Sequence, residues 1–282
     1  MRSGFHLLVA PFLASCVRIQ PPQAGTLPPS PSVPAPETAT PRSWTFSFAP
    51  GTVAYHVSRS AAIENASDSG RRELSTNSTY ETLAIQPGTD TIAFTVAVDT
   101  FTTTAQGAIG TAQPVQLPLQ LAGLVIGDSL TIVSDSLSER CSAVTTALIT
   151  DLRNLLPHWP TTLSTAAVWK DSVNLTECQG SIPTNSHTSR IFRVVGESTY
   201  DAIPVLVVQR ADTIQAQGEG AQQQHQLQLK ASGVGSATYY MDTSSGRILH
   251  LTISQDLSLT ITASGKTSYF RQNAKEDFTL VR

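Results

Sequence analysis

Alternation of apolar and polar residues recurs through most of the chain and limits what it can fold into. The segments 92–98, 226–230 and 249–253 all place apolar residues at every second position. Because successive side chains of a strand point to opposite faces of a sheet, this period of two predicts β-strands with one buried face. Turn signals such as Pro87-Gly88 and Ser264-Gly265 separate these segments, and links this short require antiparallel neighbours.

One segment near the middle of the chain has a different period. Between 136 and 155 the apolar residues recur at steps of three and four, the spacing of one face of an α-helix. The tetrapeptide SLSE at 136–139 has the pattern of a capping box and Pro157 stops the pattern, so we expect a helix near 136–156. The predicted fold class is α+β, mainly β: a large curved antiparallel sheet, an open half-barrel, with one long amphipathic helix packed on it.

The start of the chain predicts an exported protein. Arg2 precedes a short apolar run, 7–14, which is far below the ~20 residues of a membrane-spanning helix and is typical of a secretory signal peptide. The tetrapeptide LASC at 13–16 resembles the lipobox of bacterial lipoproteins. That resemblance implies a signal peptide at 1–15 and a lipid on Cys16 that attaches the protein to the membrane. An ordinary signal with an incidental cysteine is the alternative.

A proline tract follows the cysteine. Eight of the chain's 17 prolines fall between Pro21 and Pro41, with almost no charge among them. Such a segment buries no core and favours extended polyproline II. We therefore expect 16–42 to be a lipidated N-terminus and a disordered stalk, and 43–282 to be a β-rich globular domain. In the lipoproteins that this segment resembles, an aspartate after the cysteine is associated with the inner membrane, and Val17 stands there instead. For a bacterium with two membranes the resemblance therefore implies the outer membrane, with the domain facing the periplasm or the cell surface.

Charge and motif content exclude several functions. Charged residues make up 14% of the chain and its formal net charge is −3, so the chain has no excess of basic residues for binding nucleic acid. The histidines show no metal-ligand spacing, and no glycine-rich loop follows a strand. We therefore predict no catalytic residue, no metal site and no cofactor.

One short motif nevertheless points to an enzyme. Residues 127–130 spell GDSL, the motif that names a family of serine esterases and lipases. A nucleophilic serine needs a histidine base and an orienting carboxylate, and the Asp-x-x-His block that supplies them in that family is absent from this sequence. Residues 130–133 also suit a strand, whereas the family has a helix there. A hydrolase with Ser129 as nucleophile is kept only as an alternative to a chain that is not an enzyme.

The two remaining cysteines predict a disulfide. With Cys16 lipidated, Cys141 and Cys178 are the only pair left, and an exported compartment permits their oxidation. The bond would join the predicted helix to the sheet, through the polar loop that follows 169–176. Two buried free thiols are the alternative.

The predicted layout looks like the open half-barrels of the LolA-like carriers of lipids and lipoproteins. The second half also resembles a family of uncharacterised bacterial lipoprotein domains, in which a tryptophan strand and an Asp-x-x-x-Gly turn occupy the places of Trp169 and 242–246. The family of uncharacterised lipoprotein domains has no settled activity that the resemblance could imply for this chain.

Three classes of function fit these observations. The first, which we favour, is a non-catalytic binding module for a hydrophobic ligand, lipid or lipoprotein. The second is a structural or protein-interaction lipoprotein of the envelope without a small-molecule site, and the third is the Ser129 hydrolase. For the first class we expect a cavity between the helix and the concave sheet face. The expected lining is Phe94, Val96, Val98, Leu148 and Leu152.

Overall fold

The structure is a computed structural model. It describes residues 42–66, 72–106, 117–127, 129–132, 143–179, 182–222 and 225–281. Pro41–Arg282 forms one compact unit. The predicted signal peptide, Cys16, the stalk up to residue 41, the capping box and Cys141 all lie outside the described residues, as does the side chain of Cys178. Among the described residues, no helix has the length and apolar character needed to cross a bilayer.

Strands dominate the described chain. In order, the elements are β1 (Ser43–Thr45), β2 (Gly51–Asn65), β3 (Arg72–Pro87), β4 (Ile92–Gln106), β5 (Leu119–Ile126), β6 (Ser129–Ile132), α1 (Ala143–Leu155), β7 (Thr162–Ser164), β8 (Val168–Gln179), β9 (Ile182–Tyr200), β10 (Ile203–Gln222), β11 (His225–Asp242), β12 (Ile248–Ala263) and β13 (Lys266–Val281). The segments with period-two alternation fall in β4, β11 and β12, which confirms the predicted strands.

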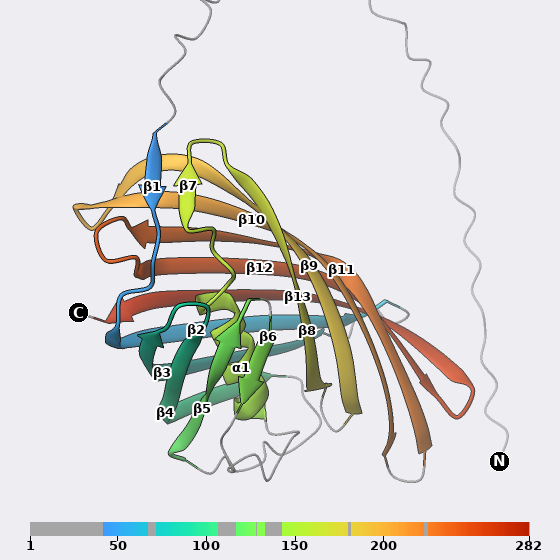
Figure 1. Ribbon diagram of the computed structural model, residues 1–282. Coiled ribbons are helices and arrows are strands. Elements are labelled where there is room, and N and C mark those ends of the chain that lie inside the picture. The colour runs from blue at the N-terminus through green and yellow to red at the C-terminus, as the bar shows by residue number, and fades with distance from the viewer. Residues whose placement is uncertain are drawn as a thin grey trace, which may run out of the picture. The chain divides into compact units, whose positions relative to one another are not determined.

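Eleven of the strands form one antiparallel sheet in the order β6-β5-β4-β3-β2-β13-β12-β11-β10-β9-β8, and β1 pairs with β7 in a separate ladder. Neighbours along the chain pair throughout, except where β2 meets β13, with Val57 opposite Phe278. Twist accumulates over so many strands and curls the sheet. Figure 1 shows it nearly closed around α1, further than the predicted half-barrel.

The described helix is shorter than the one predicted. α1 covers 13 residues, Ala143–Leu155, so the long helix expected over 136–156 is not shown, and 136–142 lie outside the described residues. Its end before Pro157 agrees with the prediction. The stripe that the core buries starts at Val144 and continues through Leu148 and Leu152, each 1% exposed.

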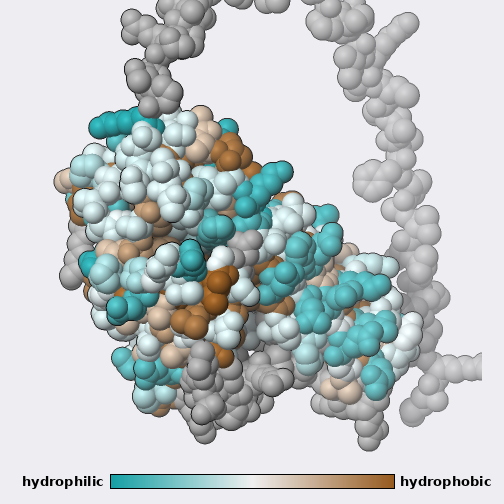
Figure 2. Space-filling view, viewed as in Figure 1, coloured by the Kyte–Doolittle hydropathy of each residue, from teal (hydrophilic) through white to brown (hydrophobic). Residues whose placement is uncertain are grey.

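The core lies on the concave side of the sheet, where α1 packs against β2–β5 and β9–β13. Phe94, Val96, Val98, Leu148 and Leu152, expected to line a cavity, are at most 3% exposed and belong to this packed cluster. The strands continue beyond α1, and there the visible outer surface is mostly hydrophilic or neutral (Figure 2). The open space on the concave side lies beside these parts of the strands that extend past α1.

Candidate binding cavity between the helix and the sheet

A cavity of about 300 Å³ lies between α1 and the strand halves that extend beyond it. Its wall combines one side of the helix with inward-facing residues of β2, β3 and β8–β13. A cavity therefore exists where the sequence predicted one, but its lining differs from the five residues expected. The volume is at the lower end of the range for small-molecule sites.

One end of the cavity is apolar. Ile214, Leu229 and Leu259 line it, and each is less than 9% exposed. Leu227 and Leu229 form a second, small core cluster, separate from the main one. Its partly buried neighbours are Ala231, Ile261 and Ala263. Alanine side chains stand beside leucines here. They are too short to fill the concave side of the sheet, so space remains.

The other end, under α1, carries buried charge around Arg59 on β2. The Arg59 guanidinium donates hydrogen bonds to Asn77 Oδ1 at 3.1 Å and Glu81 Oε1 at 3.0 Å, and it also pairs with Asp151 of α1. The side chains of Glu81 and Asp151 are each 1% exposed. Although burial opposes its charge, the Asp151 and Glu81 carboxylates raise the pKa of Arg59, so it stays protonated.

Asp151 titrates abnormally at this end of the cavity. Burial raises its pKa well above the ordinary value of 3.8, and the charges of Glu81 and Glu276 raise it further, against the opposing effect of Arg59. A hydrogen bond with Glu81 also favours the protonated form. Oδ1 of Asp151 has no hydrogen-bond partner among the described residues, although Asp151 lines the cavity. Buried carboxylate oxygens are almost always hydrogen-bonded, so this atom is an open acceptor.

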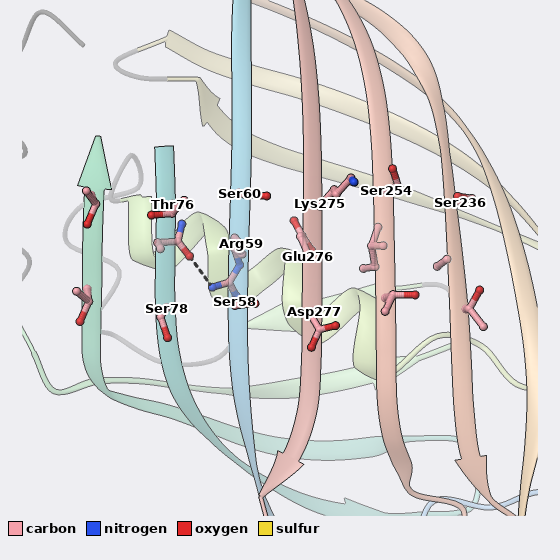
Figure 3. A pocket seen from close by; sticks show the side chains of 17 residues that line it. Ser58, Arg59, Ser60, Thr76, Ser78, Ser236, Ser254, Lys275, Glu276 and Asp277 are labelled. Carbon is pink, nitrogen blue, oxygen red and sulfur yellow. Dashed lines mark hydrogen bonds between the residues drawn. The ribbon is translucent and has the colours of Figure 1, made fainter. Parts of the chain in front are cut away.

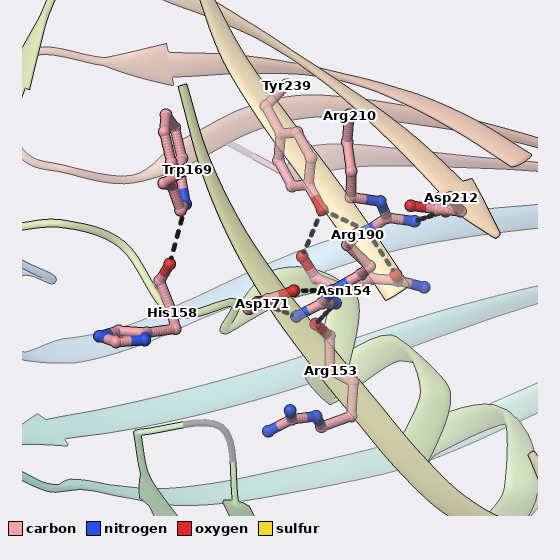
Figure 4. A network of polar contacts seen from close by, with 9 residues as sticks. All are labelled: Arg153, Asn154, His158, Trp169, Asp171, Arg190, Arg210, Asp212 and Tyr239. Carbon is pink, nitrogen blue, oxygen red and sulfur yellow. Dashed lines mark hydrogen bonds and ion pairs between the residues drawn. The ribbon is translucent and has the colours of Figure 1, made fainter. Parts of the chain in front are cut away.

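A second polar network fixes the end of the helix (Figure 4). Arg190 holds Asp171 in a two-bond ion pair, 2.6 and 2.5 Å, and donates to the Arg153 carbonyl at 2.9 Å. Arg210 donates to Asn154 Oδ1 at 2.9 Å and to Asp212 at 2.8 Å. The carbonyls in the last turn of a helix have no intrahelical partner. Arg190 of β9 therefore caps α1, and Arg210 of β10 holds its last turn through the Asn154 side chain.

Tyr239 of β11 completes this network. Its hydroxyl accepts from Arg210 at 2.6 Å and donates to the Asn154 carbonyl at 3.2 Å. Burial raises the pKa of Tyr239, so the hydroxyl keeps the proton that it donates. Nε of Arg210 and Oδ1 of Asp212, both lining residues, have no partner among the described residues.

A larger hollow, about 610 Å³, lies on the outer face of the sheet. Two rows of side chains line it, each crossing β4, β3, β2, β13, β12 and β11 in register. One row is Thr102, Ser78, Ser58, Asp277, Thr252 and Thr238; the other is Thr104, Thr76, Ser60, Lys275, Ser254 and Ser236. Figure 3 shows several of these side chains, with α1 behind the strands. Hydroxyl groups and one charge of each sign keep this face hydrated.

The other residues singled out in the sequence lie apart from the cavity. Ser129 is the exposed first residue of β6, an edge strand, and a strand rather than a helix follows it. His250 lies on β12, in the other half of the sheet, where it stacks with Tyr200. The backbone of Cys178 lies near the end of β8. The turn at Asp242–Gly246 joins β11 to β12 as predicted, with Asp242 accepting hydrogen bonds from Ser244 and Ser245.

Sequence reasoning missed the inward-facing charges. Arg210 and Asp212 have the same strand parity as Val208 and Ile214, whose side chains are buried. Asp151 likewise follows Leu148 by three residues and so lies on the apolar side of the helix. The signal in the sequence was a charged residue at a position where the apolar periodicity predicts a buried side chain. Such a residue could have been predicted to be buried and paired.

Comparisons with known proteins identify no family. No family model and no curated protein matches the chain. Two solved structures align weakly over most of its length. The beta domain of the Bordetella autotransporter BrkA is 9% identical, with 80% of this chain and 98% of that chain covered and a TM-score of 0.22. Salmonella typhi OmpF in complex with daunomycin is 8% identical, with 83% and 98% covered and a TM-score of 0.25. Scores this low support no inference about function.

Proposed function

We propose that the domain is a non-catalytic binding module that holds a hydrophobic or amphipathic ligand between α1 and the concave face of the sheet. The observation that carries this proposal is the cavity itself, with an apolar end around Leu229 and Leu259 and a charged end under the helix. A site of mainly apolar walls with a few fixed polar groups is the usual form of a small-molecule pocket.

The proposed setting is the bacterial envelope. The lipobox at 13–16 and the proline tract that follows it would anchor the domain by a lipid on Cys16 and hold it away from the bilayer. The proposed location is the outer membrane, with the domain in the periplasm or at the cell surface. A ligand taken from a membrane, such as a lipid or the acyl part of a lipoprotein, suits both the anchor and the apolar end of the cavity.

Thermal unfolding of the full chain carrying Cys16→Ser, which removes the predicted lipid, tests the proposal. A ligand that binds only the folded state raises the melting temperature, and at a given concentration a tighter ligand raises it more. Lysophospholipids and fatty alcohols, added below their micellar concentrations, should raise it. Ala231→Phe fills the cavity and should abolish the shift, whereas Ser232→Phe, on the opposite face of the same strand, should preserve it.

The unliganded melting temperatures of the two variants show whether each still folds. If no lipid shifts the wild-type protein, the binding proposal fails, and a protein-interaction role without a small-molecule site becomes the better explanation.

A further inference from the structure

Two buried arginine–aspartate pairs on neighbouring strands beside α1 differ in how completely they are bonded (Figure 4). In the first pair, Arg190 donates from Nε and Nη2 to the two carboxylate oxygens of Asp171, at 2.6 and 2.5 Å. In the second pair, Arg210 donates to Asp212 from Nη2 alone, at 2.8 Å. We call the two atoms that remain, Nε of Arg210 and Oδ1 of Asp212, the open fork.

Both atoms of the open fork lack a hydrogen-bond partner among the described residues, although the side chains of Arg210 and Asp212 are only 2% and 1% exposed. The remaining nitrogen of the guanidinium is in use, because Nη1 donates to Asn154 and to Tyr239. Arg210 and Asp212 both line the cavity. Since buried polar atoms are almost always bonded to protein or water, the open fork marks a place in the cavity wall where a polar group from outside the chain fits.

The open fork combines one donor with one acceptor. Arginine stays protonated and only donates, and an ionised carboxylate only accepts. A single group that satisfies both atoms must therefore accept from Nε of Arg210 and donate to Oδ1 of Asp212. A hydroxyl does both, whereas an ammonium group has no acceptor and a carboxylate has no donor. The two side chains carry opposite charges, so a neutral head group leaves their balance unchanged.

The cavity wall becomes apolar directly beyond the open fork. Ile214 and Ala216 are the next inward-facing residues of β10 after Asp212, and both line the cavity. Leu229 of β11, another lining residue, pairs with Gly218, which is six residues after Asp212 on β10. At the rise of a strand this is about 20 Å. A polar head position and an apolar tail position therefore follow one another along a single pair of strands.

We infer that the cavity takes a neutral amphiphile with a hydroxyl head, such as a long-chain alcohol or an acylglycerol, whose hydroxyl occupies the open fork and whose chain lies along Ile214 and Leu229. This inference rests on the proposed function, because it names the ligand class of the same cavity. A water molecule is the competing occupant of the open fork, since it also donates and accepts.

Two isomeric probes test the inference. 1-Decanol and methyl nonyl ether are titrated at neutral pH, below their solubility limits, into the full chain carrying Cys16→Ser, and dissociation constants are measured by calorimetry. The alcohol should bind about tenfold more tightly, because it alone can donate a hydrogen bond to Asp212 Oδ1. A cavity without the open fork should favour the ether, since an alcohol loses more hydration on entering an apolar site.

Asp212→Asn changes the head-group preference without removing the side chain. The amide oxygen can still accept from Nη2 of Arg210, which leaves the amide nitrogen in the place of Oδ1, so that both atoms facing the ligand are donors. The ether should then bind at least as tightly as the alcohol. Asp171→Asn is the matched control, because it makes the same change in the fully bonded pair, whose aspartate is not among the residues that line the cavity. Its preference for the alcohol should persist.

The outcomes distinguish this inference from the proposed function. If neither probe binds, both fail. If the ether binds wild-type protein as tightly as the alcohol, water fills the open fork, and the hydroxyl site is wrong while the apolar cavity stands. The inference is also overturned if Asp212→Asn keeps the preference for the alcohol or if Asp171→Asn loses it. Unliganded melting temperatures show whether each variant folds, and if Asp212→Asn does not, the comparison of the two probes on wild-type protein decides.

Discussion

Arg190 on β9 donates a 2.9 Å hydrogen bond to the backbone carbonyl of Arg153 in the last turn of α1. The same guanidinium holds the buried carboxylate of Asp171 on β8. One side chain therefore bonds a carbonyl at the end of the helix and also pairs with a buried charge. Because α1 forms one wall of the cavity, its fixed position over the strands determines the shape of the binding site.

The first prediction concerns this arginine. Arg190→Met should lower the free energy of unfolding by about 3–5 kcal/mol, because it leaves Asp171 buried without its partner. Urea unfolding followed by circular dichroism measures the loss. Adding Asp171→Leu to the same chain should recover a large part of it, since the uncompensated charge is then gone. A double variant no more stable than Arg190→Met would show that the helix cap, not the buried charge, dominates.

The second prediction compares two leucines. Leu152→Ala removes a side chain from the packed core under the helix and should cost about 2–5 kcal/mol. Leu229→Ala, in the small cluster beside the cavity, should cost no more than the low end of that range, because fewer neighbours lose contacts. The two variants are compared by denaturant midpoints at constant m-value. Equal losses would mean that the cavity end is packed as tightly as the core.

The third prediction uses the raised pKa of Asp151. As pH rises above 3.8, the unfolded chain releases this proton while the folded chain retains it. Stability therefore falls with rising pH until the folded pKa is passed, with a slope of at most about 1.4 kcal/mol per pH unit from this group. Asp151→Asn removes this contribution, so its stability relative to wild type should increase from pH 4 towards neutrality. A difference that is constant across this range would contradict the raised pKa.

The fourth prediction concerns the two cysteines of the domain. Cys141 and Cys178 should form a disulfide in the exported protein, stabilising it by roughly 3–4 kcal/mol on the chain-entropy model. Thiol titration of unfolded protein, with and without reductant, measures the number of free cysteines. Two free thiols without reductant, in a chain with Cys16→Ser, would exclude the bond.

The fifth prediction concerns the anchor. Mass spectrometry of the mature protein should find an acylated Cys16 at its N-terminus, and Cys16→Ser should leave the precursor uncleaved at this position. An unmodified N-terminus at any other residue would rule out the lipoprotein.

The sequence indicated the strands where one face is apolar and the other polar. The turn at Ser264-Gly265 lies between β12 and β13, as predicted. Much of β9 could not be found this way, because polar Ser186, Thr188 and Arg190 occupy its inward face beside the cavity. Period-two alternation appears only where one face of a strand is buried and apolar. Beside the cavity, the inward face of the sheet is partly polar.

The pairing of β2 with β13 could not be predicted either, since local pattern says nothing about which distant strands meet. The buried charges were missed for a related reason. Arg59 and Arg210 are stabilised by partners on other elements, so each looks like an error in an apolar pattern until the fold brings those partners together.

The ladder between β2 and β13 has a consequence for how the protein is made. Among the strands that the structure describes, it is the only pairing that joins β2–β6 to β8–β13. During synthesis the first half of the sheet must therefore wait for the last strand before the two halves can join. Contacts this distant in sequence make folding slow. A nascent chain that cannot complete its fold early stays unfolded for longer, and an unfolded chain is the form that the proposed export through a translocation channel would require.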